Sequence, residues 1–157
     1  MALGESSLYE TLINEATVLF RGANYTHEVD TIKELDNFVS INSAIEVDLF
    51  GQVNSEFAGG KQLSGTGGAV DFMRAAKTSS GGKSIIAMNA TAKGGKKSKI
   101  VPKVEMVTAL RTDVDIVVTE FGVARIKDLP VKERGRALAE IAAPEFRDEL
   151  LADPLFD

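Results

Sequence analysis

A glycine-rich run constrains this chain more than any other feature, because it stands between a strand-like segment and a helical one. The run reads Ser64-Gly65-Thr66-Gly67-Gly68-Ala69-Val70-Asp71, and six of the 14 glycines lie between residues 51 and 68. Downstream, apolar side chains recur at helical spacing, at Val70, Phe72, Met73 and Ala76. A glycine loop in this position fits an α/β domain, in which ligands lie at the carboxyl ends of strands.

The glycines suit this loop to hold a negatively charged oxygen. Glycine adopts positive φ angles and lets the backbone approach a ligand closely. The first amides of a helix have no partner inside it and carry the positive end of its dipole. Gly65, Gly67 and Gly68 could therefore direct two or three N–H groups at a phosphate, or at the oxyanion that develops in acyl transfer. A flexible turn that caps the helix is the alternative interpretation.

Two common nucleotide-binding motifs do not fit the run. No Lys-Ser/Thr pair follows the glycines, which excludes a Walker motif. Val70 stands where a dinucleotide fingerprint has glycine or alanine. The run therefore indicates an anion site without identifying a nucleotide.

The rest of the pattern predicts an α/β fold with an open mixed sheet flanked by helices, in a single domain over residues 1–157. Helices are expected over 7–15, from Gly68 to about 79–82, over 131–143 and over 145–152, with one helical turn at 32–36. Strands are expected over 17–20, 38–49, 53–57, 84–90 and 115–120, the second being one half-buried strand or two joined by a bulge. A hairpin with its turn at 92–97 and its returning strand at 98–104, a loop at 24–31 and a break at Gly122 complete the prediction.

Composition excludes several classes of protein. The chain has no cysteine and one histidine, which argues against disulfides and against a zinc or other metal site. No apolar run approaches the roughly 18 residues that a membrane span needs, and residues 1–5 do not resemble a signal peptide. We therefore expect a cytoplasmic protein that does not bind membranes.

Positive charge is concentrated in one segment of an acidic chain. Residues 72–104 contain eight basic and no acidic residues, while the rest of the chain contains 10 basic and 23 acidic ones. Such a segment can concentrate an anionic ligand, although a solvated hairpin is the plainer interpretation. Nucleic acid is not expected as a partner, because the segment has almost no aromatic residues and the net charge is −5.

Several blocks in order resemble the C-terminal part of the acetyl-CoA hydrolase/transferase family, which includes 4-hydroxybutyrate CoA-transferase and succinyl-CoA:acetate CoA-transferase. The blocks are Ser40 to Glu56 (SINSAIEVDLFGQVNSE), Gly65 to Phe72 (GTGGAVDF), Thr91 to Pro102 (TAKGGKKSKIVP), Asp113 to Ala124 (DVDIVVTEFGVA) and Ala143 to Leu150 (APEFRDEL). The resemblance runs from about residue 3 to residue 151.

The resemblance implies a fold like the C-terminal domain of a CoA-transferase, and a specific chemistry. In the family, a glutamate attacks an acyl-CoA thioester, and an acyl-glutamyl anhydride is followed by a glutamyl-CoA thioester. A backbone N–H of the glycine loop stabilises the oxyanion, which makes Gly67 the expected donor and Gly68 its alternative. Coenzyme A is then a substrate rather than a bound cofactor, and its expected contacts are Gly65, Thr66, Lys93, Lys96 and Lys97.

The resemblance covers only about the final third of the family's chain. The nucleophilic glutamate of the family precedes the block that matches residues 40–56, so we expect it outside these 157 residues. Glu56 lies close to the glycine loop and is the remaining candidate, although it does not match the nucleophile's motif. The expected partners are acyl-CoA, a small carboxylate and the missing N-terminal half, and exposed surface makes self-association a further expectation.

Three functions remain open for a chain of this kind. It is the C-terminal domain of a CoA-transferase, part of an acetyl-CoA hydrolase, or a non-catalytic fragment that binds CoA or has a structural role. Two residues have plainer roles. His27 is expected to be structural or solvated. Arg111 is expected to pair with Asp113 or Asp115, with contact to an anionic ligand as the alternative.

Overall fold

The computed structural model describes residues 4–156, and its central feature is a four-stranded sheet of order β1-β6-β10-β11. The strands are β1 (Val39–Asn42), β6 (Lys83–Ala87), β10 (Ile116–Thr119) and β11 (Gly122–Arg125). The first three are parallel, with Ile41 opposite Ile85 and Val117 opposite Ile86. β11 returns antiparallel to β10, so the sheet is mixed and open. This confirms the predicted fold class.

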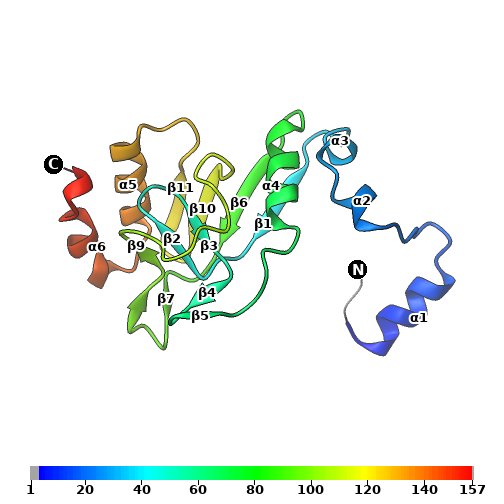
Figure 1. Ribbon diagram of the computed structural model, residues 1–157, viewed down its shortest axis with the longest axis horizontal. Coiled ribbons are helices and arrows are strands. Elements are labelled where there is room, and N and C mark those ends of the chain that lie inside the picture. Colours follow the sequence, from blue (N-terminus) through cyan, green and yellow to red (C-terminus); the bar gives the residue numbers. More distant parts are fainter. Residues whose placement is uncertain (1–3, 157) are drawn as a thin grey trace.

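A second sheet and two hairpins lie beside the first sheet (Figure 1). The second sheet has the order β3-β2-β9, formed by Val53–Asn54, Glu46–Asp48 and Ile100–Val101. One hairpin joins β4 (Phe57–Ala58) to β5 (Lys61–Gln62), and the other joins β7 (Thr91–Ala92) to β8 (Lys97–Ser98). In Figure 1 both hairpins lie at the lower end of the view, away from the turn that follows α4.

Helices pack on both sides of the four-stranded sheet. α4 (Ala69–Thr78) packs against β1 and β6, and α3 (Val29–Ile32) packs on α4. At the other side, α5 (Val131–Glu140) packs against β11 and α6 (Pro144–Leu151), and a 3₁₀ turn, η1 (Pro154–Phe156), follows. α1 (Ser6–Asn14) extends to the right in Figure 1, away from this body, and α2 (Ala23–Thr26) contacts α3.

The core lies between the sheets and these helices. Its largest fully buried apolar side chains are Leu49, Met73, Ile86, Ile100, Ile126 and Leu138. They come from segments on both sides of the four-stranded sheet. The burial of their apolar surface therefore stabilises the packing of the helices and the second sheet on the first. No helix among residues 4–156 is long and apolar enough to cross a membrane.

Most predicted elements are confirmed, with shifted ends. α1, α4, α5 and α6 match the four predicted helices, and β6 and β10 match two of the predicted strands. The predicted basic hairpin is confirmed, but its returning strand is short: β8 ends at Ser98, and Ile100–Val101 then pairs with β2 instead. The break expected at Gly122 lies slightly earlier: β10 ends at Thr119, residues 120–121 form the turn, and Gly122 is the first residue of β11, a strand that the sequence did not reveal.

Several predictions were wrong. The strand expected over 53–57 forms two short strands in different sheets, β3 and β4. The helical turn expected at 32–36 lies earlier in the chain, as α3. Residues 17–20 form no strand, because no other segment pairs with them. Residues 24–31, expected as a loop, include most of α2 and most of α3. The short helix α3 forms because Ile32 is buried under α4, a contact that the local sequence does not disclose.

The segment 38–49 forms two strands, which belong to different sheets. Within β1 the alternation is inverted: Ser40 is buried, whereas Val39 and Ile41 are exposed on the other face. Val39 and Ile41 are 44% and 65% exposed, so the face of β1 that carries them is left largely uncovered by the described part of the chain. The alternation therefore predicted the strand, but not which of its faces is buried.

Candidate functional site

The glycine loop leaves the β4–β5 hairpin and enters α4. Its first part is fixed by the main chain of Glu56, whose carbonyl oxygen accepts hydrogen bonds from the N–H groups of Leu63 at 2.7 Å and Ser64 at 3.4 Å. The chain then turns at Gly67, which has a φ of 58°, and Gly68 is the N-cap of α4. A positive φ at this position favours glycine, which explains one of the glycines in the run.

The N–H groups of Gly67 and Gly68 have no hydrogen-bond partner among residues 4–156. No side chain caps the start of α4 either. A cleft of about 420 Å³ opens here, lined by Ala23, His27, Glu28, Gly67, Gly68 and Asp71. Unpartnered amides at the amino end of a helix, beside an open cleft, can donate to a ligand oxygen.

The cleft is not electropositive. Glu28 and Asp71 place two carboxylates on its lining, against the positive end of the α4 dipole. The site therefore offers directed N–H groups rather than a net positive charge. Such a site suits an oxygen that is neutral when it binds and becomes charged during a reaction.

His27 lies against the glycine loop, which sequence reasoning did not foresee. Its ring centre is 4.8 Å from that of Phe72, and its Nδ1 is 2.9 Å from the hydroxyl oxygen of Thr26. A Cβ added at Gly68 would lie only 2.2 Å from the His27 ring. The absence of a side chain at Gly68 therefore lets α2 approach the loop, and no local sequence signal could have shown this.

Glu56 lies at the base of the loop and its side chain is buried, with 7% of the residue exposed. The side-chain oxygen of Asn54 accepts hydrogen bonds from the N–H groups of Glu56 and Phe57, at 3.2 and 3.0 Å. Oε2 of Glu56 is buried and lacks a partner among the described residues. The structure thus places this carboxylate next to the loop in sequence and in space, but holds it inside the protein.

The basic hairpin belongs to a different cavity from the glycine loop. Lys96 and Lys97 line a cavity of about 210 Å³ together with Ile100, Pro102 and Phe146 among others, and this cavity shares no lining residue with the cleft at Gly67. Lys97 donates to Oε1 of Glu46 at 2.6 Å, so its charge is already paired. Lys93 and Lys96 are exposed, and Lys93 stands in the turn with a φ of 53°.

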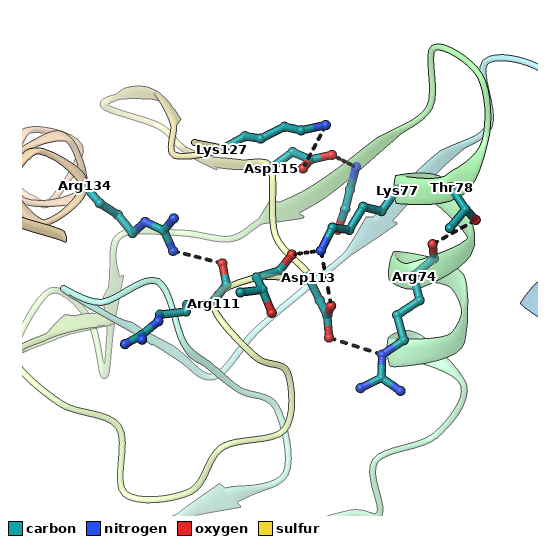
Figure 2. A network of polar contacts seen from close by, with 10 residues as sticks. Arg74, Lys77, Thr78, Arg111, Asp113, Asp115, Lys127 and Arg134 are labelled. Carbon is teal, nitrogen blue, oxygen red and sulfur yellow. Dashed lines mark hydrogen bonds and ion pairs between the residues drawn. The ribbon is translucent and has the colours of Figure 1, made fainter. Parts of the chain in front are cut away.

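Arg111 does not form the predicted ion pair. Figure 2 shows its side chain pointing away from Asp113 and Asp115. Asp113 instead contacts Arg74 at 3.3 Å and Lys77 at 4.0 Å, and Asp115 contacts Lys127 at 3.8 Å. The prediction was wrong because the fold places other cations next to these carboxylates: α4 supplies those beside Asp113, and the segment after β11 supplies the one beside Asp115.

Comparison with known proteins assigns the chain. Residues 4–153 match the acetyl-CoA hydrolase/transferase C-terminal domain. The chain is 47% identical to the 4-hydroxybutyrate coenzyme A transferase of Clostridium kluyveri over 152 residues, which are 95% of this chain and 35% of that protein. It is 39% identical to the butyryl-CoA:acetate CoA-transferase of Anaerostipes caccae over 158 residues, 97% of this chain and 35% of that protein.

The fold agrees with this assignment. The crystal structure of RipA from Yersinia pestis superposes with a TM-score of 0.89 at 42% identity, covering 94% of this chain and 34% of that one. The chain spans about a third of the length of the relatives that it matches. It belongs to the acetyl-CoA hydrolase/transferase family, of which it matches the C-terminal domain.

Proposed function

We propose that this chain forms the oxyanion and acyl-CoA side of a CoA-transferase active site, whose nucleophilic glutamate lies in a preceding N-terminal part. The observation that carries the proposal is the pair of N–H groups at Gly67 and Gly68, unpartnered within residues 4–156, beside an open cleft at the start of α4. Membership of the family supports the reaction class.

The reaction places negative charge on a carbonyl oxygen in every step. The glutamate carboxylate attacks the thioester carbon, the C–S bond breaks, the CoA thiolate leaves and an acyl-glutamyl anhydride remains. The thiolate then attacks the glutamyl carbonyl carbon, which releases the donor acid and leaves glutamyl-CoA. An acceptor carboxylate reverses both steps. Gly67 donates its N–H to the oxyanion, with Gly68 as the alternative, and one such donor contributes roughly 3–4 kcal/mol.

The charge of the cleft supports an oxyanion rather than a phosphate. A phosphate is negatively charged when it binds, so the carboxylates of Glu28 and Asp71 on the cleft would repel it. A thioester carbonyl is neutral when it binds and gains charge only under attack. Directed N–H groups stabilise that transient charge without a cation.

Coenzyme A is proposed to bind along the loop and the basic hairpin. Gly65 and Thr66 precede the oxyanion donor, and Lys93 and Lys96 are exposed cations that can reach phosphates. Lys97 would have to exchange its ion pair with Glu46 for a phosphate, so we propose a smaller contribution from it. Glu56 is not proposed as the nucleophile, because its carboxylate is buried.

A chimera tests the proposal. Residues 4–153 of this chain replace the matching C-terminal region of the Clostridium kluyveri relative, and CoA transfer from acetyl-CoA to 4-hydroxybutyrate is measured. Gly67→Pro removes the N–H and also displaces the loop, because proline holds φ near −65° whereas Gly67 has a φ of 58°. We expect it to lower kcat about 10²- to 10³-fold, and coenzyme A binding, measured beside kcat, reports how far the loop has moved. Gly67→Ala, which keeps the N–H in the same strained region, is the matched control and should retain more turnover.

Equal losses in Gly67→Ala and Gly67→Pro would show that loop shape matters and the N–H does not. The chain alone, incubated with acetyl-CoA and acetate and then with borohydride, is expected to give no trapped glutamyl adduct. A stoichiometric adduct at Glu56 would contradict the placement of the nucleophile outside residues 4–156.

The hydrolase alternative differs only in what resolves the glutamyl-CoA thioester. The description of the family names both hydrolase and transferase activity, and this is the observation that supports the hydrolase as a second candidate function. In the chimera, release of free coenzyme A from acetyl-CoA at the same rate with and without an acceptor carboxylate would indicate hydrolysis. If neither activity is restored although coenzyme A binds, the non-catalytic alternative holds.

A further inference from the structure

A third cavity, of about 170 Å³, lies at the opposite end of α4 from the glycine loop. Its lining includes Lys77 near the end of α4, Arg111, Asp115 just before β10, and Lys127 after β11. Because β11 is antiparallel to β10, Lys127 and Asp115 meet at the amino end of β10. The cavity therefore lies at the edge of the sheet where β6 and β10 begin, and it shares no lining residue with the cleft at Gly67.

Arg134, on α5, forms one wall of this cavity and is 9% exposed. Its Nη1 donates to the carbonyl oxygen of Arg111 at 2.9 Å (Figure 2). The same Nη1 donates to the carbonyl oxygen of Phe50 at 3.2 Å, and the two hydrogen bonds fix the guanidinium. A Cβ at Gly51 would lie 3.1 Å from its Cδ, so glycine there makes room for it. Nε is buried without a partner, and Nη2 also has none among the described residues. One edge of a buried guanidinium is thus left without an acceptor.

The surrounding charges do not neutralise Arg134. Lys77 donates to the carbonyl oxygen of Thr112 at 2.6 Å, and Lys127 lies 3.8 Å from Asp115, whose other oxygen accepts the N–H of Ser84 at 3.0 Å. None of these carboxylates contacts Arg134. Four cations and two carboxylates, Asp115 and Asp128, line the cavity. Burial, and then the nearby charge of Arg111, lower the pKa of Arg134, while the charge of Asp128 raises it without outweighing the other two.

We propose that this cavity binds a phosphate group, held by the free edge of Arg134 together with Lys127. The edge of a guanidinium can donate two parallel N–H···O hydrogen bonds to two oxygens of one phosphate. Without such an acceptor, a buried arginine lowers the stability of the folded protein. The cavity holds only a few water volumes, so it accommodates one phosphate group and not a whole nucleotide. The phosphate is either free inorganic phosphate or the terminal group of a larger molecule that remains outside.

The test follows the Nε–H of Arg134 directly. The ¹⁵N-labelled chain is titrated with inorganic phosphate at constant ionic strength, and in a separate arm with coenzyme A. Phosphate is expected to shift the Arg134 Nε–H resonance saturably. If coenzyme A shifts it at lower concentration than phosphate does, the phosphate belongs to the larger molecule. If only phosphate shifts it, the ligand is free phosphate.

A variant at the rim separates a built site from general charge attraction. Lys127→Gln, at an exposed position, is expected to weaken phosphate binding roughly fivefold, the effect of one charge at close range in water. Lys103→Gln removes the same charge at an exposed position outside the cavity and should leave binding unchanged. The proposal is overturned if the Arg134 Nε–H does not move, or if Lys103→Gln weakens binding as much as Lys127→Gln. In the first case the cavity holds only water.

Discussion

Gly67 and Gly68 are adjacent, but a side chain at each position would meet a different obstacle. At Gly67 there is open space for a Cβ, yet the φ of 58° is unfavourable for any other residue. At Gly68 the φ of −92° is ordinary, but a Cβ would lie 2.2 Å from the His27 ring. We expect Gly67→Ala to lower the free energy of unfolding by about 1 kcal/mol and Gly68→Ala by about 1–3 kcal/mol, as measured by urea denaturation.

A double-mutant cycle separates the two causes. His27→Ala removes the ring that a Cβ at position 68 would meet, so it should relieve much of the cost of Gly68→Ala. It should leave the cost of Gly67→Ala unchanged, because that cost is in the backbone. Additive effects of His27→Ala and Gly68→Ala would contradict the contact between α2 and the glycine loop.

Lys99 gives a pH-dependent contribution to stability. Burial of this half-buried side chain lowers its pKa from the ordinary value of 10.5. The unfolded chain therefore binds more protons than the folded one between the lowered pKa and 10.5, so this residue makes stability rise with pH across that window. At neutral pH the protonated lysine is destabilising.

The expected result is that Lys99→Met is more stable than the wild type at pH 7, and that its advantage shrinks as the pH rises toward 10.5. Urea denaturation at several pH values measures both. Lys103→Met, at an exposed position, is the matched control and should show no such trend. An advantage that is constant with pH would mean that the gain is apolar burial alone.

At the scale of elements, α4 could be predicted because all its signals are local. The glycines precede it, apolar residues recur through it and paired glycines at 81–82 follow it. β11 could not, since it is short and depends on pairing with β10 from Ile116 to Thr119. The burial of Ser40 in β1, with Ile41 exposed, depends in the same way on which face the neighbouring elements cover.

α1 is expected to form without stabilising the rest of the protein. It has no buried residue, and residues 15–21 are exposed throughout. Removing residues 1–21 should therefore change the free energy of unfolding by less than about 0.5 kcal/mol, as urea denaturation would measure. Ile32→Ala, which empties a site that is 5% exposed under α4, should cost about 2–4 kcal/mol by comparison. A comparable loss from the deletion would mean that α1 packs on the body.

At the scale of the whole molecule, the two sites differ in how far the sequence could reveal them. Glu56 and the glycine loop are neighbours in the chain, so one segment suggested both. The cavity at Arg134 joins α4, the segment before β10, the segment after β11 and α5. Sequence reasoning singled out Arg111 but paired it with the wrong residues, because the positions of Lys77 and Lys127 depend on the packed fold.

The surface of the whole chain is larger than its mass requires. The solvent-accessible area is 9399 Å², whereas a compact monomer of this mass exposes about 7,600 Å². Part of the excess is apolar and lies on the extended N-terminal segment, where Tyr9, Leu12, Ile13 and Phe20 line an open cleft of about 560 Å³. Ile13 is 83% exposed and Phe20 is 65% exposed. Apolar surface of this kind favours association.

We therefore expect the chain to self-associate as its concentration rises, as measured by sedimentation velocity. The double variant Ile13→Lys, Phe20→Lys should shift the distribution toward monomer, because each lysine places a charge in the apolar cleft. Ile41→Lys is the matched control: Ile41 on β1 is also 65% exposed but lies outside this cleft. If Ile41→Lys abolishes association and the double variant does not, copies of the chain meet along the open edge of β1 instead. A wild-type chain that is monomeric at every concentration would show that neither surface is enough to hold two copies together.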